Sequence, residues 1–186
     1  RLASSLTEPC TVAVARTPGA QGVVAVLAGQ VHAGDRVRKV HTYRTDAFSS
    51  GDAGPLGVVE EGVLRRFTPW PTGEALGLGV LPQADAPWPW VEIVTSHGGA
   101  GGAAVRALQA AGVQGLVVAC TGNGTVHRAL EVALAEAEAI GIPVWRSTRC
   151  AGGVVVGAAA GPAAAMSPWQ ARLALQLTLL RARAGA

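Results

Sequence analysis

The second half of the chain alternates continuous apolar runs with amphipathic runs of helical period. The apolar runs predict strands at Val91–Thr95, Gly115–Cys120 and Ile142–Thr148, and the amphipathic runs predict helices at Gly101–Gly112, Thr125–Gly141 and Ser167–Ala184. Strands separated by helices with short connections are typical of βαβ units, which build a parallel sheet. The strand runs show no polar alternation, as expected for strands buried on both faces. We therefore predict an α/β fold, with a parallel sheet covered by helices on both faces.

The boundaries of the last predicted helix are marked by specific residues. Ser167 is suited to cap its N-terminus, and Pro168 fits the first helical position. Arg181 and Arg183 lie near its end, where the helix dipole favours positive charge. These signals place the helix start at Ser167.

The first half is less regular. Val23–Leu27 predicts a short buried strand, and Gly57–Phe67 predicts a hairpin whose turn contains Glu60, Glu61 and Gly62. Between Thr68 and Pro89 the composition shifts to Pro, Gly and Trp with little periodicity, which is typical of a linker. The chain is thus expected to divide into residues 1–67, a linker at 68–89 and a domain at 90–186.

Composition and charge exclude several classes of chain and partner. Of the 186 residues, 49% are hydrophobic and 15% are charged, enough apolar material for a core and too much for a disordered chain. The net charge is +3 and the basic residues are scattered, so we expect neither nucleic acid nor a membrane surface as a partner.

The start of the sequence lacks the apolar core of a signal peptide. The most apolar stretch, Ala151–Met166, is too short and too interrupted by Gly and Pro to span a bilayer.

Cysteine and histidine positions give no sign of a metal. Cys10, Cys120 and Cys150 lack metal-ligand spacing, and free cysteines in proteins are usually buried. The four histidines are also scattered. We therefore expect three buried free thiols, no metal and no cofactor.

Two polar loops follow predicted strands. Thr121, Asn123 and Thr125 stand in a Gly-rich loop at the carboxyl end of a strand, where open α/β sheets bind ligands. The loop matches neither the dinucleotide fingerprint nor the P-loop, so a tight strand-to-helix turn competes with an anion site. Ser96 and His97 follow the preceding strand, but adjacent residues seldom face each other on an extended segment. No group of residues supplies a nucleophile, a base and an orienting group together, so these residues alone indicate a ligand-binding α/β domain.

Several ordered motifs resemble bacterial L-asparaginases. The segment VRKVHTYRTDAFSSGDAGPLG is similar to the family's connector: Lys39, Thr42, Asp46, Phe48 and Gly54–Gly57 fit, and Thr45 and Ala47 depart from the pattern. The segments VEIVTSHGGAGG, GVQGLVVACTGNGTV, IGIPVWRSTRCAGG and SPWQARLALQL resemble later family motifs in the same order. The resemblance covers roughly Val12 to Leu180.

The resemblance implies the C-terminal, Rossmann-like domain of an asparaginase, preceded by a remnant of the N-terminal α/β domain. It implies that Val40–Gly57 is the crossing between two domains, and that Val23–Leu27 lies in a parallel sheet with strands that precede Arg1. The family hydrolyses Asn to Asp and ammonia through a Thr in a Thr-Gly-Gly-Thr motif, helped by a Thr-Asp pair and a Lys. These motifs are missing here, and the pair at Thr45–Asp46 belongs to the connector. We therefore expect the chain to begin after the catalytic region and to contain no catalytic residue.

The family's C-terminal domain completes the active site of a neighbouring subunit. By resemblance, the candidate substrate-binding residues are Ser96, His97 and Gly99. Glycines at 99 and 101 stand where the family often has polar residues, and an acidic substrate-binding residue after the third strand has no counterpart. The resemblance implies L-asparagine, or also L-glutamine, as substrate, a homo-oligomer, and a cytoplasmic or periplasmic location. The alternative is a non-catalytic or degenerate module that binds Asp or Asn in the same cleft.

Overall fold

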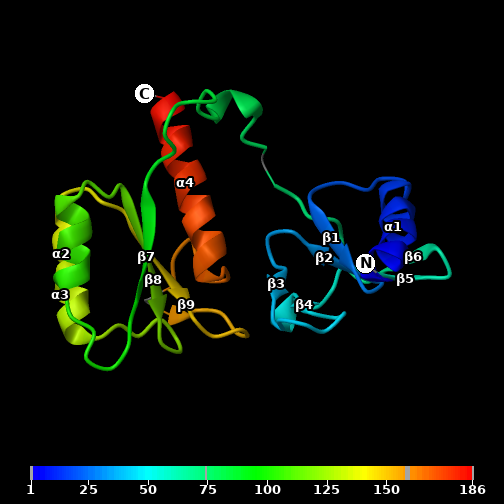
Figure 1. Cartoon of the computed structure of the whole chain (residues 1–186), viewed down its shortest axis with the longest axis horizontal. Helices are drawn as coiled ribbons and strands as arrows, with labels where there is room; N and C mark the ends of the chain where they lie inside the picture. Colours follow the sequence, from blue (N-terminus) through cyan, green and yellow to red (C-terminus); the bar gives the residue numbers. More distant parts are fainter. Residues whose placement is uncertain (1, 74, 158–159, 186) are drawn as a thin grey trace. The chain divides into compact units, whose positions relative to one another are not determined.

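The chain forms two compact units, and each is described here by itself. The computed structural model describes residues 2–73, 75–157 and 160–185, and in the first helix the side chains only from residue 9 onward. The first unit comprises residues 1–74 and the second residues 75–186 (Figure 1).

In the first unit, a helix packs on a four-stranded antiparallel sheet. The helix is α1 (Leu2–Ala15), and the strands follow the order β1-β2-β5-β6. Their bounds are β1 Val24–Leu27, β2 Gln30–Ala33, β5 Gly57–Glu60 and β6 Val63–Arg66. Two tight turns, Ala28-Gly29 and Glu61-Gly62, have positive φ at both positions, as two-residue hairpins require.

Both strand expectations for this unit can be compared with the structure. The hairpin expected at Gly57–Phe67 is present as β5 and β6, which pair in antiparallel fashion. The strand expected at Val23–Leu27 is present as β1, which pairs antiparallel with β2 on one side and lies at the edge of the sheet among the described residues. Its parallel pairing with strands that precede Arg1 stays a prediction. A two-residue connection reverses the chain, and parallel neighbours need a long crossover instead.

The polar stretch Val40–Gly57 lies within the first unit, so the expectation that it crosses between domains is wrong. It follows the short strand β3 (Arg38–Lys39), which pairs antiparallel with β4 (Phe48–Ser49), and continues through the 3₁₀ turn η1 (Gly51–Ala53). Backbone hydrogen bonds hold the stretch to the sheet, for example from Leu56 N–H to the Val31 carbonyl (2.7 Å). The core of this unit is small; its buried hydrophobic residues are Val14, Val31, Ala33, Leu56 and Trp70.

The second unit contains the parallel sheet predicted from the sequence. Three strands, β7 (Val91–Thr95), β8 (Gly115–Cys120) and β9 (Val144–Thr148), lie in the order β7-β8-β9, and both pairs are parallel. The helices are α2 (Ala103–Ala110), α3 (Arg128–Ala139) and α4 (Pro168–Ala184), and a 3₁₀ turn, η2 (Leu78–Val80), precedes β7. The α/β fold class and its parallel sheet are confirmed.

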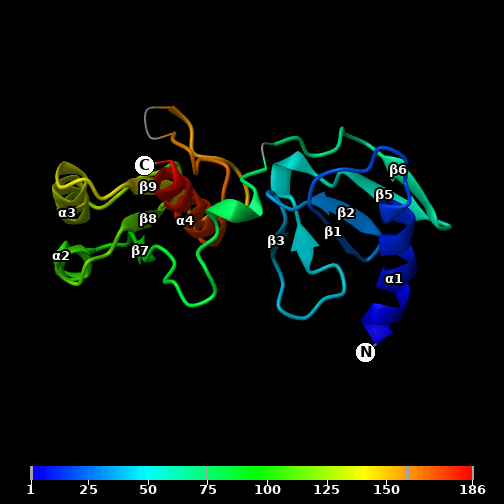
Figure 2. The same ribbon diagram turned by 90° about the horizontal axis from the view of Figure 1, so that it is seen from above.

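Helices cover both faces of this sheet, as expected from the apolar strands. Helices α2 and α3 lie on one face and α4 lies on the other (Figures 1 and 2). Val118 packs in the core on the α2–α3 side, whereas Val117 packs with Leu175 of α4. All six residues of β8 are buried, which explains their uniformly apolar sequence.

Two side-chain expectations have different outcomes. The start of α4 is confirmed, because Ser167 and Gln170 form a reciprocal capping box and Pro168 occupies the first turn. The expectation of three buried thiols is wrong in part: Cys120 is buried, Cys10 is partly buried and Cys150 is exposed. Cys150 follows the end of β9 in a loop, where no strand neighbours cover it.

Candidate functional site

The candidate site lies at the carboxyl edge of the sheet in the second unit. Because β7, β8 and β9 are parallel, the loops that follow them emerge at the same edge, where open α/β sheets bind ligands. These loops comprise residues 96–102, 121–127 and 149–157. Together they carry the polar residues singled out from the sequence.

Ser96 is held in place by the neighbouring loop. Its side chain is buried, and its Oγ accepts a hydrogen bond from the backbone N–H of His127 (2.9 Å). The imidazole of His127 in turn caps α3, since Nδ1 accepts from the N–H of Ala129 (3.3 Å). Ser96 therefore fixes the start of α3 relative to the end of β7.

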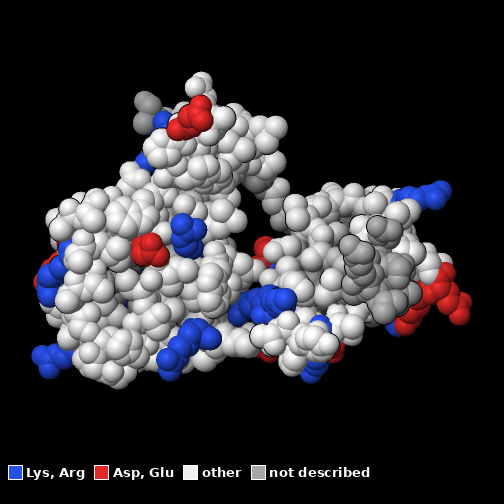
Figure 3. Space-filling view, viewed as in Figure 1, with Lys and Arg blue, Asp and Glu red and all other residues white. Residues whose placement is uncertain are grey.

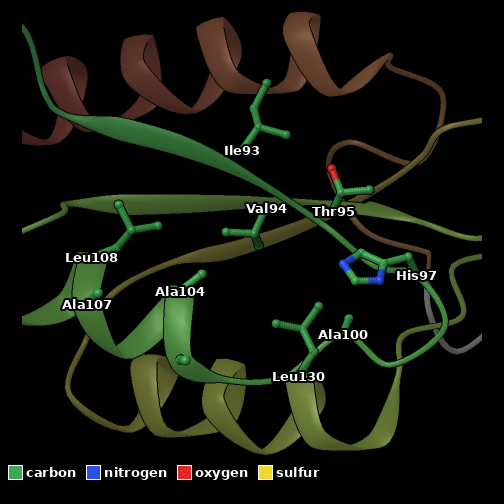
Figure 4. A pocket seen from close by; sticks show the side chains of 11 residues that line it. Ile93, Val94, Thr95, His97, Ala100, Ala104, Ala107, Leu108 and Leu130 are labelled. Atoms are coloured by element: carbon green, nitrogen blue, oxygen red, sulfur yellow. The ribbon is translucent and has the colours of Figure 1, made fainter.

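His97 points away from that hydrogen bond. Its side chain is exposed, and Nδ1 lies 2.9 Å from the carbonyl oxygen of Gly98. It stands at one end of a cavity of about 680 Å³ between β7 and α2 (Figure 4). Ser96 and His97 thus have separate partners, which agrees with the sequence argument against a Ser–His pair.

Gly99 leaves open space in the same loop. It has a φ of +79°, which favours glycine, and a Cβ built there would meet nothing within 4 Å. The loop residues expected to contact substrate are therefore one buried Ser, one exposed His and one Gly, and of these three only His97 has an exposed polar side chain beside the cavity.

The Gly-rich loop after β8 is a tight turn. The backbones of Thr121 and Thr125 exchange two hydrogen bonds of 3.0 Å each, and the Thr121 hydroxyl also donates to the Thr125 carbonyl (3.0 Å). The Thr148 hydroxyl, from the end of β9, donates to the Gly122 carbonyl (2.8 Å). These bonds favour the structural role of a strand-to-helix turn over an anion site.

Asn123 forms two hydrogen bonds with the third loop, residues 149–157. Its Oδ1 accepts from the N–H of Val156 (2.6 Å), and its Nδ2 donates to the Val156 carbonyl (3.3 Å). Sequence reasoning found Asn123 but missed this role, because the partner lies 33 residues further along the chain. No local signal could have shown the pairing.

One ion pair lies beside this edge. Arg146 of β9 and Glu131 of α3 form a two-pronged hydrogen-bonded pair, which raises the pKa of the Arg146 guanidinium. Burial raises the pKa of the nearby Cys120 thiol, so this sulfur is kept protonated and unreactive. Neither residue therefore supplies a nucleophile.

The rest of the described surface offers no candidate metal site. No three His, Cys, Asp or Glu side chains there are placed to share a metal ion. On the face shown in Figure 3, the Lys and Arg side chains are scattered rather than gathered into one patch. None of the described helices is both long enough and apolar enough to cross a bilayer.

Comparison with known proteins identifies the family. Residues 90–184 match the model of the glutaminase/asparaginase C-terminal domain, and residues 3–71 match the model of the N-terminal asparaginase domain. The chain is 33% identical to a glutaminase-asparaginase of Pseudomonas fluorescens over 148 residues, which is 78% of this chain and 41% of that protein. It is 30% identical to L-asparaginase 2 of Escherichia coli over 178 residues, covering 88% of this chain and 49% of that protein.

Proteins named for another activity also occur among the relatives. One subunit of a glutamyl-tRNA(Gln) amidotransferase of Halobacterium salinarum is 31% identical over 160 residues, covering 78% of this chain and 37% of that protein. The chain thus spans less than half the length of these curated relatives.

A solved structure agrees with the sequence comparisons. The crystal structure of a probable cytoplasmic L-asparaginase from Campylobacter jejuni superimposes with a TM-score of 0.79 at 26% identity, over 95% of this chain and 59% of that chain. Both family models match in the expected order along the sequence, and the C-terminal model alone covers more than half of it. The chain therefore belongs to the glutaminase/asparaginase family.

Proposed function

We propose that this chain is the C-terminal part of an amidohydrolase that converts L-asparagine, or also L-glutamine, to the acid and ammonia. The observation that carries the proposal is the carboxyl edge of the β7-β8-β9 sheet, where three loops are tied together by Ser96, Asn123 and Thr148. A rigid edge of this kind can form the wall of a substrate cleft. Family membership supports amide hydrolysis as the reaction.

The reaction needs a nucleophile that this sequence does not provide. In the intact enzyme a Thr hydroxyl, activated by a base, would attack the side-chain amide carbon, and oxyanion donors would stabilise the tetrahedral intermediate. Ammonia would leave, and water would then hydrolyse the threonyl ester. The hydroxyls of Ser96 and Thr148 are buried and hydrogen-bonded to backbone groups, so neither of these two is placed to attack substrate.

The second unit would contribute to substrate binding in a homo-oligomer. His97 is exposed beside the cavity, and with Nδ1 donating to the Gly98 carbonyl, its Nε2 can donate to a substrate carboxylate when the ring is protonated. Gly99 leaves room for substrate, and Ser96 holds the loop in position. We place the intact protein in the cytoplasm, in line with the name of the Campylobacter relative.

A second candidate is amide transfer. The resemblance to amidotransferase subunits favours it, because such a subunit would release ammonia for use elsewhere instead of as a final product. The alternative from another class is a binding module for Asp or Asn that lacks catalysis.

The first prediction concerns activity. The purified 186-residue chain should release no ammonia from L-asparagine or L-glutamine above the uncatalysed background, because its sequence lacks the Thr-Gly-Gly-Thr motif that the family resemblance implies for the nucleophile. Ammonia release is measured with a coupled dehydrogenase assay, with a full-length asparaginase as the positive control. Ammonia release by the pure chain would contradict the proposal that the nucleophile is not part of this sequence.

A separate experiment tests the proposed function itself. The genomic sequence upstream of Arg1 should encode a Thr-Gly-Gly-Thr motif in the same reading frame, and the joined protein should release ammonia from L-asparagine. A genuine start codon near Arg1 would instead support the binding module, and titration with L-aspartate would then measure its affinity.

A further inference from the structure

A second cavity lies in the first unit. Its volume is about 270 Å³, somewhat below the range of about 300–1,000 Å³ that is usual for drug-sized ligands, so it suits a smaller molecule. Its walls are formed by residues of three segments, 33–36 at the end of β2, 53–56 ahead of β5 and 68–72 after β6. All of these residues belong to the first unit, whereas the candidate functional site lies in the second.

Trp70, which lines this cavity, carries a buried donor without an acceptor. The residue is 7% exposed, and its indole N–H has no hydrogen-bond partner within the described part of the chain. The Arg66 guanidinium lies over the ring, 5.5 Å from its centroid, but a cation on the ring face does not accept from the N–H. Buried polar groups in proteins are almost always hydrogen-bonded. An acceptor atom brought by a bound molecule is therefore favourable at this wall.

The backbone on both sides of Trp70 is held in place. On one side, the N–H of Phe67 donates to the carbonyl of Leu56 (2.7 Å). On the other side, Pro71 packs closely on Gly22, since a Cβ built on this glycine would lie 3.0 Å from the Cβ of Pro71. The wall is therefore formed before any molecule binds, as in most ligand sites.

Two adjacent charged residues, Asp35 and Arg36, also line the cavity, and both are exposed. Arg36 forms no ion pair with a described residue, and a guanidinium presents paired N–H groups that match a carboxylate. Asp35 already interacts with another group of the chain, and its negative charge balances that of Arg36. A singly charged anion is therefore favoured over a dianion such as phosphate, which Asp35 repels more strongly.

Part of the wall is apolar. Ala33, Ala53, Leu56 and Pro69 all line the cavity. A short hydrocarbon chain placed against these residues leaves water, which is favourable. The ammonium group of an amino acid would instead lose water of hydration beside the same surface, which is unfavourable. The wall therefore favours an aliphatic carboxylate over an amino acid.

We propose that this cavity binds a short aliphatic monocarboxylate of about the size of propionate or butyrate. The indole N–H of Trp70 donates to one carboxylate oxygen, the guanidinium of Arg36 neutralises the charge, and the hydrocarbon chain packs on the side of Leu56. The proposal does not rest on the proposed function, because every group that it uses belongs to the first unit.

The indole N–H of Trp70 reports binding directly. Five Trp residues give five indole signals in ¹⁵N-labelled protein, and the signal of Trp70 is identified by its loss in Trp70→Phe. Sodium propionate should move this signal downfield in a saturable manner, because a new hydrogen bond deshields the proton, and sodium chloride at the same ionic strength should not. A signal that stays in place, or that moves equally with chloride, would overturn the proposal.

Two further probes test the class of ligand. Sodium phosphate and L-alanine, which has the carbon chain of propionate with an added ammonium group, should each bind at least about tenfold more weakly than propionate. Equal binding of phosphate would indicate a general anion site, and tighter binding of L-alanine would indicate an amino-acid site. Either result contradicts the proposed class.

Matched variants test the role of Arg36. Arg36→Gln should raise the apparent Kd for propionate by about tenfold, because hydrogen bonds to a charged group are lost. Arg36→Lys should lie between the two, since it keeps the charge without the paired N–H groups. The control is Arg44→Gln, which removes the same charge from an exposed residue of the same unit that pairs with Asp46, and it should leave the Kd unchanged. Equal weakening by Arg36→Gln and Arg44→Gln would reduce the effect to net charge and refute the site.

Discussion

Single buried polar residues in this chain are satisfied by partners far away in the sequence. His32 of β2 is 1% exposed, and its Nδ1 lies 2.9 Å from the Ser50 hydroxyl, 18 residues further on. Ser96 likewise accepts from the backbone of His127, 31 residues away. Each of these hydrogen bonds joins a strand residue to a distant loop. A His or Ser that looks like a catalytic candidate in the sequence therefore serves mainly to position a loop.

His32 gives a prediction for the pH dependence of stability. Burial lowers the pKa of its imidazole in the folded state, whereas the unfolded chain keeps the ordinary value of about 6.5. Below about pH 6.5 the unfolded state binds a proton that the folded state does not, so stability falls as the pH drops and levels off below the folded pKa. The free energy of unfolding of the first unit, measured by urea titration between pH 7.5 and 5, should show this loss.

The matched variants separate this effect from general acid sensitivity. His32→Gln should flatten the pH dependence, because the titrating group is gone and an amide can still bond Ser50. His41→Gln should keep the wild-type slope, because His32 is still present. An unchanged slope in His32→Gln would refute the assignment.

Among the elements, the close approach of α2 and α3 depends on one glycine. A Cβ built on Gly102 would lie 2.6 Å from the Cβ of Ala133 on α3, an atom fixed to the helix backbone. In contrast, a Cβ on the adjacent Gly101 would meet nothing within 4 Å. The sequence shows two neighbouring glycines, but only the packing of the helices distinguishes them.

The corresponding prediction compares these two positions. Gly102→Ala should destabilise the second unit by about 1–3 kcal/mol, because the helices must separate to admit the methyl group. Gly101→Ala should change stability by no more than about 0.5 kcal/mol. The difference is measured from denaturant-dependent hydrogen exchange of the β8 amides. Equal effects of both substitutions would mean that α2 and α3 are not so closely packed.

In the whole molecule, the two units differ in the size of their cores. Among the residues whose side chains the structure describes, five buried hydrophobic residues form the core of the first unit, whereas eleven and five form the two cores of the second. Apolar burial is the main favourable term in folding, so the first unit should be the less stable one.

Regional hydrogen exchange tests this difference. Amides in Val12–Phe67 should exchange considerably faster than those in 90–186, and the first unit should unfold at lower urea concentration. Edge strand β1 and the exposed side chains of Val23 and Phe67 should also promote self-association, which light scattering detects. Uniform protection of both units in a monodisperse monomer would contradict the prediction.

The sequence alone determined the architecture of the second unit and its family. Continuous apolar runs such as Gly115–Cys120, helices of regular period and the Ser167 cap are local signals, and local signals are enough where strands and helices alternate with short connections. Ordered motifs from Lys39 to Leu177 added the family, which the comparisons bear out.

Only the tertiary structure decided the antiparallel sheet of the first unit and the organisation of the loops at the site. Strand pairing in β1-β2-β5-β6 and the pairing of Asn123 with Val156 join residues that are distant along the chain. The position of β7 at the edge of the three-stranded sheet, among the described residues, is likewise visible only in the structure. The hydrophobic pattern of a segment indicates which of its faces is buried. Which other segment packs beside that face depends on how the whole chain folds.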